Sequence, residues 1–248
     1  MRPQTEILVD RVRKVAHEGS GTIQTFLLHL QSTGIDYVPS PLSLSDRLEE
    51  ISYLPGACYG PVEPRPNEAW DIEHLERLGL AIRRCHDSSV EFLSSWRAAQ
   101  WFPFAEPCAA PEVICHNDLG PWNVPVDGEH IHIIDWEMAA PGMRIWDVAH
   151  IAWNWVPYFP LAERARVGFP EPYQPEARLA ALLKGYGASH WTAREVLEEV
   201  LQRQSRTLEL AALSISTEAM LLENWANVET DPILADQAFV RECIGKTA

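Results

Sequence analysis

The sequence HNDLGPWN at residues 116–123 lies between two short apolar segments, the second of which ends at Asp135. The Gly120–Pro121 pair predicts a turned loop, so the side chains of Asp118 and Asn123 can converge at its mouth. The second segment, HIHIID, alternates apolar and polar residues and predicts a strand with its aspartate at the C-terminal end. We therefore expect two carboxylates and one carboxamide to face the same cleft.

These three side chains form a set of oxygen ligands that suits Mg²⁺ better than zinc. Mg²⁺ keeps several waters and takes further ligands from the phosphates of a substrate. An aspartate that does not bind the metal can orient a hydroxyl group and accept its proton as the oxygen attacks phosphorus. The pattern, with one free aspartate beside an aspartate–asparagine pair, therefore indicates phosphoryl transfer.

The composition predicts an acidic globular protein. The 248 residues carry a formal net charge of −15, which disfavours nucleic acid and anionic membranes as partners. No window has the ~18 uncharged apolar residues that a membrane span needs. The first residues lack a secretory signal, and the five cysteines include no C-x-x-C pair, which fits a reducing compartment. We expect a cytoplasmic protein that binds neither nucleic acid nor membrane.

The order of predicted elements divides the chain into a β-rich start and a helical remainder. Residues 6–16 and 39–56 each predict two short strands, and residues 22–33 predict a helix with Thr22 as its N-cap. A proline-rich stretch at residues 55–66 is expected to connect the two parts. Beyond it we expect an amphipathic helix over 69–87, short strands around the 116–123 loop, and three or four helices from residue 145.

The loop and the aspartate that follows it resemble the H-x-D-x-x-x-x-N catalytic loop and the metal-binding aspartate of the aminoglycoside phosphotransferase and choline kinase family. The segment PGMRIWDVAH resembles a third block of this family, in which a glycine is followed by an aspartate that opens a helix. Three segments resemble the family's third small-lobe strand, its hinge and a helix that often ends in Leu-His: VRKVA, EEISYLPG and AIRRCHDSS. The stretch IDWEMAAPGMRIWDVAH, together with EEISYLPG, also resembles bacterial proteins named for trifolitoxin immunity.

Members of this family share the protein-kinase-like fold. The resemblance therefore implies an α+β, bilobal protein-kinase-like fold with a shortened β-rich N-lobe and a mainly helical C-lobe. Residues 1–56 would form the reduced nucleotide-binding lobe and hinge, and residues 57–248 would form the C-lobe with the catalytic and metal-binding loops. No Gly-rich phosphate loop precedes VRKVA, and position 117 is Asn where the family commonly has Gly.

The resemblance also implies roles for the residues of the catalytic loop. Asp118 would be the catalytic base, and His116 would brace the loop through its ring. Asn123 and Asp135 would bind the metal ion. Asp147 would anchor the loop backbone from the start of the following helix.

The nucleotide contacts follow from the same resemblance. Either Lys14 or the adjacent Arg13 would contact the phosphates of ATP, and we favour Lys14. The helix that follows has no acidic residue to pair with this lysine. The hinge would bind the adenine through the main-chain groups of Ser52, Tyr53 and Leu54.

Three functions are compatible with these patterns. The first is an ATP- and Mg²⁺-dependent phosphotransferase that acts on a hydroxyl of a small molecule, with an aminoglycoside-like or choline-like acceptor and a role in antibiotic or toxin resistance. The second is a catalytically inactive, kinase-like binding or immunity protein. The third is a metal-dependent hydrolase, whose ligands would be His116, Asp118, His130, His132 and Asp135.

Overall fold

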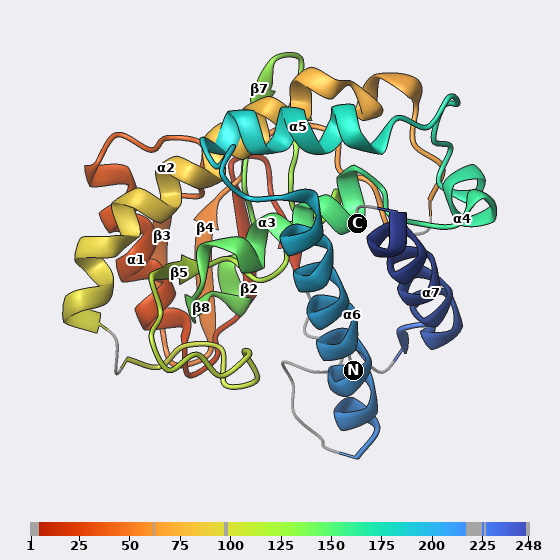
Figure 1. The fold of residues 1–248 in the computed structure, drawn as a ribbon. Helices are drawn as coiled ribbons and strands as arrows, with labels where there is room; N and C mark the ends of the chain where they lie inside the picture. Colours follow the sequence, from red (N-terminus) through yellow and green to blue (C-terminus); the bar gives the residue numbers. More distant parts are fainter. Residues whose placement is uncertain (1–4, 62, 97–98, 217–224, 226, 247–248) are drawn as a thin grey trace. The chain divides into compact units, whose positions relative to one another are not determined.

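Figure 1 draws the computed structural model. The chain divides into two compact units. The first unit comprises Met1–Cys58 and Leu80–Asp147, and the second comprises Tyr59–Gly79 and Val148–Ala248. The division between lobes after residue 56 stays a prediction. The structure describes residues 5–61, 63–96, 99–216, 225 and 227–246.

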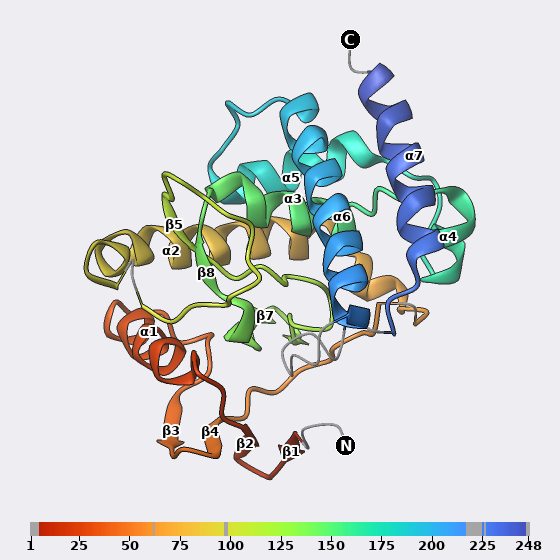
Figure 2. The same ribbon diagram turned by 90° about the horizontal axis from the view of Figure 1, so that it is seen from below.

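A four-stranded antiparallel sheet opens the first unit. Its strands are β1 (Glu6–Ile7), β2 (Arg11–Val15), β3 (Pro41–Leu44) and β4 (Leu48–Ser52), in the spatial order β1-β2-β4-β3 (Figure 2). Both predicted strand pairs are confirmed. In the register of β2 and β4, a basic pair lies opposite an acidic pair, with Arg13 opposite Glu50 and Lys14 opposite Glu49.

Helix α1 (Ser20–Ser32) packs beside β3, as Figure 1 shows. The prediction that Thr22 caps this helix is wrong, because the helix begins two residues earlier. The backbone N–H of His17 donates to Ser20 Oγ at 3.0 Å, which forms the turn that starts the helix there. Four apolar side chains are buried at helical spacing, as predicted: Ile23, Phe26, Leu27 and Leu30.

Two small strand pairs frame the predicted catalytic loop. Strand β5 (Val113–Cys115) pairs with β8 (Ala140–Gly142), and β6 (Val126–Asp127) pairs with β7 (His130–Ile131). The predicted strand over HIHIID is wrong beyond Ile131. The N–H of Ile133 donates to Tyr37 O and that of Ile134 donates to Asn123 O, so neither residue continues the β6–β7 ladder.

The described residues of the second unit are mainly helical. Its helix α5 (Pro175–Tyr186) is tied down by the buried guanidinium of Arg178, which donates to the carbonyls of Trp70 and Trp155. The sequence predicts three or four helices in this part of the chain, and the described residues after 143 form five α-helices. The additional helix is the short α4 (Leu161–Arg166), which has six residues. None of the described helices has both the length and the hydropathy needed to cross a membrane.

The remaining helices have the following bounds. Helix α2 (Ile72–Trp96) follows a 3-10 turn at Asn67–Trp70, and α3 (Arg144–Trp155) follows β8. A second 3-10 turn at Trp136–Met138 precedes β8. Helices α6 (Ala193–Ser216) and α7 (Thr230–Lys246) lie side by side in both views (Figures 1 and 2).

Candidate active site

Lys14 lies at the centre of a group of three carboxylates in the first unit. Its Nζ is 3.1 Å from Asp135 Oδ1, 3.4 Å from Glu137 Oε2 and 3.5 Å from Glu49 Oε1. Strand β4 supplies Glu49, whereas the other two carboxylates come from the segment after β7. The sheet and this segment therefore meet at one cation.

The neighbouring Arg13 points to the other face of β2. Its guanidinium pairs with Glu6 Oε2 at 3.0 Å and with Glu50 Oε1 at 2.9 Å. Successive side chains of a strand face opposite sides, so only one of the two candidates can reach the segment with Asp135. That candidate is Lys14.

The charges of this group depend on one another. Burial opposes the ammonium of Lys14, but Asp135, Glu137 and Glu49 outweigh this effect and raise its pKa. Burial likewise opposes the charge of Asp135, and Lys14 reverses the balance and lowers the pKa of that carboxyl group. Burial and the charge of Asp135 raise the pKa of Glu137. Because the Asp135 side chain is 41% exposed, water screens part of its attraction to Lys14.

Glu49 and Glu137 were not among the predicted site residues. The helix after Lys14 has no acidic residue, and Glu49 comes instead from the adjacent antiparallel strand. The signal is present in the sequence, because the adjacent basic residues of β2, Arg13 and Lys14, match the two adjacent glutamates of β4. Glu137 lies two residues after Asp135, in the turn that follows it.

The loop places Asp118 and Asn123 in direct contact. Asn123 Nδ2 donates to Asp118 Oδ2 at 2.8 Å and to Asp118 O at 2.9 Å. The indole Nε1 of Trp122 donates to the same carboxylate oxygen at 3.0 Å. Oδ2 of the predicted base is therefore held by two donors from its own loop.

His116 connects this loop to the segment that carries Asp135. Its Nδ1 accepts from the N–H of Asp118 at 3.2 Å, so the ring proton lies on Nε2, which donates to Ile134 O at 2.8 Å. The N–H of Ile134 in turn donates to Asn123 O at 3.0 Å. The ring of His116 is buried, and its two nitrogens connect the loop to the segment before Asp135.

Two residues of this region adopt left-handed backbone conformations. Asn117 has φ 70° and Asp135 has φ 62°. Asn and Asp are the residues other than Gly that tolerate this conformation best, which explains an Asn at position 117. The Asn117 side chain donates to Met138 O at 2.8 Å and accepts from Trp146 Nε1 at 2.9 Å.

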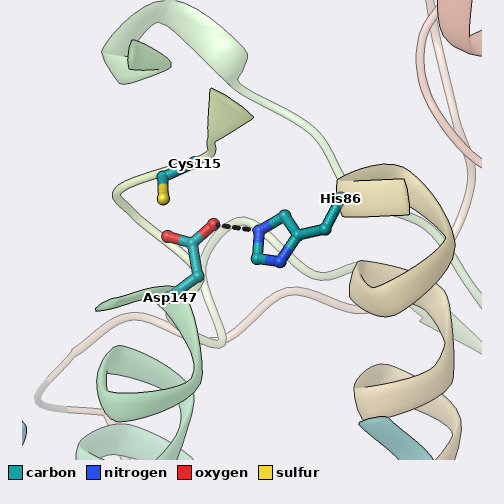
Figure 3. A group of neighbouring side chains, drawn as sticks. All are labelled: His86, Cys115 and Asp147. Atoms are coloured by element: carbon teal, nitrogen blue, oxygen red, sulfur yellow. Dashed lines mark hydrogen bonds and ion pairs between the residues drawn. The ribbon is translucent and has the colours of Figure 1, made fainter. Parts of the chain in front are cut away.

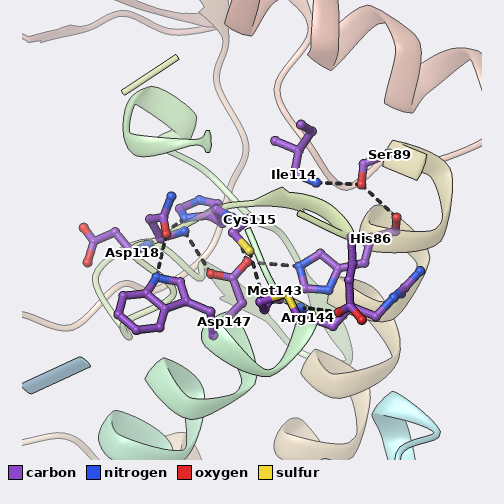
Figure 4. Close-up of polar contacts among 12 residues, drawn as sticks. His86, Ser89, Ile114, Cys115, Asp118, Met143, Arg144 and Asp147 are labelled. Atoms are coloured by element: carbon purple, nitrogen blue, oxygen red, sulfur yellow. Dashed lines mark hydrogen bonds and ion pairs between the residues drawn. The ribbon is translucent and has the colours of Figure 1, made fainter. Parts of the chain in front are cut away.

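Asp147, in the first turn of α3, anchors the loop backbone. Its Oδ2 accepts from the N–H of His116 at 2.7 Å and from His86 Nε2 at 3.1 Å, and its Oδ1 accepts from the N–H of Asn117 at 2.9 Å. Burial opposes its charge, but the bond from His86 and the other donors lower its pKa to about 2. In Figure 4 the Asp118 carboxylate points away from Asp147, so the loop presents its predicted base on the side opposite its anchor.

The triad of His86, Cys115 and Asp147 offers three metal-ligand types within 4.8 Å (Figure 3). Both oxygens of Asp147 already accept hydrogen bonds, and Cys115 Sγ donates to Met143 O at 3.3 Å. The triad is therefore a hydrogen-bonded support for the loop. Among the described residues, neither His130 nor His132 belongs to a group of three such ligands.

The predicted hinge residues lie at the end of β4. The N–H of Ser52 donates to Ser40 O at 2.8 Å, and that of Tyr53 donates to Asp10 O at 3.0 Å. Within the described chain, the N–H of Leu54 makes no hydrogen bond. Of the three main-chain N–H groups, this one is the candidate to bind a ligand.

The fold is that of the protein-kinase-like phosphotransferases. The match to a spectinomycin phosphotransferase with AMP bound covers 93% of this chain and 87% of that protein, with a TM-score of 0.60 and 12% identity. An amicoumacin kinase in complex with AMP-PNP and Ca²⁺ covers 99% and 89%, with a TM-score of 0.59 and 14% identity. A choline/ethanolamine kinase family protein from Mesorhizobium loti covers 98% and 90%, with a TM-score of 0.53 and 12% identity. The predicted fold class is confirmed.

Residues 23–197 match the phosphotransferase enzyme family, and the chain belongs to this family. It is also 32% identical over 180 residues to the trifolitoxin immunity protein of Rhizobium leguminosarum bv. trifolii. This match covers 68% of the chain and 65% of the relative. The family resemblance seen in the loop motifs is thus confirmed over most of the chain.

Proposed function

We propose that this protein is an ATP- and Mg²⁺-dependent phosphotransferase that transfers a phosphoryl group to a hydroxyl of a small molecule. The observation that carries the proposal is the connection of two polar segments through Ile134. Its N–H and C=O bond to Asn123 and His116 of the loop, and Asp135 follows it directly. The predicted base, the predicted metal ligands and Lys14 are therefore held in one continuous network.

The chemistry of the donors fits a divalent cation. The carboxylates around Lys14 already stabilise one positive charge, and within the described residues Asn123 Oδ1 has no hydrogen-bond partner. Asn123 and Asp135 would hold Mg²⁺, which when bound supplies neutralisation of charge on the β- and γ-phosphate oxygens.

Asp118 would orient the acceptor hydroxyl and accept its proton during attack on phosphorus. Lys14 would pair with phosphate oxygens, and Leu54 N–H would donate to the adenine. His116 and Asp147 would keep the loop in its bonded conformation.

The solved proteins of similar fold support the proposed choice of nucleotide and acceptor. Their structures contain ADP with spectinomycin, AMP, or AMP-PNP with Ca²⁺, and others are choline or ethanolamine kinases. The net charge of −15 favours a cationic acceptor. We propose an amino sugar or an amino alcohol.

One alternative has a specific observation in its favour. The 32% identical relative is named an immunity protein, and a kinase-like protein that only binds a peptide toxin would share the fold and could have lost nucleotide binding. Such a protein would neither bind Mg²⁺-ATP nor turn it over.

Calorimetric titration with Mg²⁺-ATP distinguishes the two. We expect the wild type and Asp118→Asn to bind similarly and Asp135→Ala to bind at least tenfold more weakly, because only the last change removes a metal ligand. The control is Asp127→Asn, which changes an exposed aspartate of the β6–β7 hairpin. Absence of binding to the wild type at millimolar Mg²⁺-ATP would favour the immunity-type function instead.

A further inference from the structure

Trp122 lies in the loop between the predicted base and the predicted metal ligand. The sequence pattern assigns no role to this position. Its indole Nε1 donates to Asp118 Oδ2 at 3.0 Å, and the same oxygen accepts from Asn123 Nδ2 at 2.8 Å. The side chains of Asp118 and Trp122 are both only half-buried. Deep packing alone therefore does not impose this contact.

Gly120 makes the position of this indole possible. A Cβ atom at residue 120 would lie 2.2 Å from Cζ2 and 2.3 Å from Cε2 of Trp122. The φ of Gly120 is not in the left-handed region, so backbone conformation does not explain a glycine here. The close approach of the indole does explain it: the ring lies directly against the loop backbone.

We infer that Trp122 is a positioning residue for phosphoryl transfer, which fixes the carboxylate of Asp118 through its indole N–H. The inference rests on the proposed function. A carboxylate held by two donors loses rotational freedom about its Cβ–Cγ bond. Its orientation toward an acceptor hydroxyl is then set before the acceptor binds. Within the loop, Gly120 leaves space for the indole, Pro121 forms the turn, and Trp122 supplies the hydrogen-bond donor.

A purely structural role for the indole predicts a different outcome. If Trp122 only filled space, its loss would lower stability and would affect nucleotide binding and turnover together. A positioning role predicts a fall in kcat with an unchanged KM for ATP, because the contact is with the base and not with the nucleotide. The separation of kcat from KM therefore distinguishes the two roles.

The test uses the full chain, Mg²⁺-ATP and ADP release with water as the acceptor. We expect Trp122→Phe, which keeps an aromatic ring and removes the donor, to lower kcat about tenfold, the effect of one hydrogen bond. KM for ATP should change less than twofold. The matched control is Trp101→Phe, which removes the hydrogen bond of 2.9 Å from the Trp101 indole N–H to the carbonyl of Trp96.

A second variant reaches the same contact from another residue. Gly120→Ala should displace the indole and reproduce the kcat loss, whereas Gly245→Ala, whose Cβ meets nothing within 4 Å, should not. The double variant Gly120→Ala/Trp122→Phe should be no worse than either single variant. ¹⁵N spectra of labelled tryptophan should show the Trp122 indole resonance moving in Asp118→Asn and Gly120→Ala.

The outcomes separate the inference from the function on which it rests. Full kcat in Trp122→Phe, with Asp118→Asn inactive, would overturn the inference and leave the phosphotransferase intact. Equal losses in Trp122→Phe and Trp101→Phe would also overturn it. Absence of ADP release by the wild type, both with water and with the amino sugars and amino alcohols as acceptors, would overturn both.

Discussion

Two buried aspartates, one in each unit, have opposite electrostatic environments. Asp147 in the first unit is fully buried, accepts three hydrogen bonds and has its pKa lowered to about 2. Asp236 in the second unit is 5% exposed and accepts one bond, from Trp153 Nε1 at 2.9 Å. Within the described residues its Oδ1 has no hydrogen-bond partner, and burial raises its pKa to about 7.

The comparison shows that burial alone does not decide the charge of a carboxylate. Both groups are removed from water, which favours the neutral acid. Three donors reverse this preference at Asp147, whereas one donor does not reverse it at Asp236. The loop beside the predicted catalytic base therefore rests on a fixed negative charge, and the second unit contains an aspartate that gains and loses its proton near neutral pH.

The largest effect is expected from Asp147→Ala. The change leaves the N–H groups of His116 and Asn117 and the ring of His86 without their acceptor. We expect the free energy of unfolding at pH 7.5 to fall by about 3–5 kcal/mol, as when one partner of a buried polar network is removed. Urea denaturation measures this change. Asp127→Ala, at an exposed position, should stay within about 0.5 kcal/mol of the wild type. A loss below about 1 kcal/mol for Asp147→Ala would contradict the anchor role.

Asp236→Asn should have the opposite sign. The folded-state pKa of Asp236 is above its unfolded value of 3.8, so its ionisation weakens the fold as the pH rises from about 4 to about 7. Above this window the neutral Asn should raise the free energy of unfolding by about 1–3 kcal/mol, since it removes a buried charge and keeps an oxygen for Trp153.

Measuring both proteins across pH sharpens this prediction. The difference in urea midpoint between Asp236→Asn and the wild type should grow from pH 4 to pH 7 and then stay constant, because the other titrating groups contribute equally to both. A difference that is independent of pH would show that Asp236 titrates at an ordinary pKa.

The smallest effect is expected from His86→Leu. Asp147 keeps two of its three donors, so the free energy of unfolding at pH 7.5 should fall by about 1–2 kcal/mol. The pKa of Asp147 is lowered, so its contribution to stability is present above about pH 4 and is lost as the pH falls toward 2. In His86→Leu this acid loss should begin at a higher pH. Acid titration followed by circular dichroism would reveal an unchanged onset if His86 had no part in setting the charge.

The sequence predicts the elements whose signals are local. The two strand pairs and the buried face of α1 follow from residue alternation and helical spacing, and the loop carries its motif in eight consecutive residues. The choice between Arg13 and Lys14 depended on the face of β2 that meets Asp135, a fact of tertiary structure.

Other features depend on distant residues. Asp135 leaves the predicted strand because the backbone of the preceding residues bonds to Tyr37 and Asn123, which no pattern in HIHIID indicates. Asp236 has no motif, since the hydrogen-bond partner of its side chain among the described residues, Trp153, lies 83 residues away in α3. The contact of Trp122 with Asp118 is local, but it needs the space at Gly120, which becomes visible only in three dimensions.

The most direct test of the account is transfer of ³²P from γ-labelled ATP to a panel of amino sugars and amino alcohols, with Mg²⁺, by the wild type and by Asp118→Asn. We predict a labelled acceptor with the wild type and at least a thousandfold less with Asp118→Asn, although both proteins bind Mg²⁺-ATP. Equal labelling by the two proteins would contradict the role of Asp118. Absence of transfer to every acceptor and to water would contradict the phosphotransferase itself.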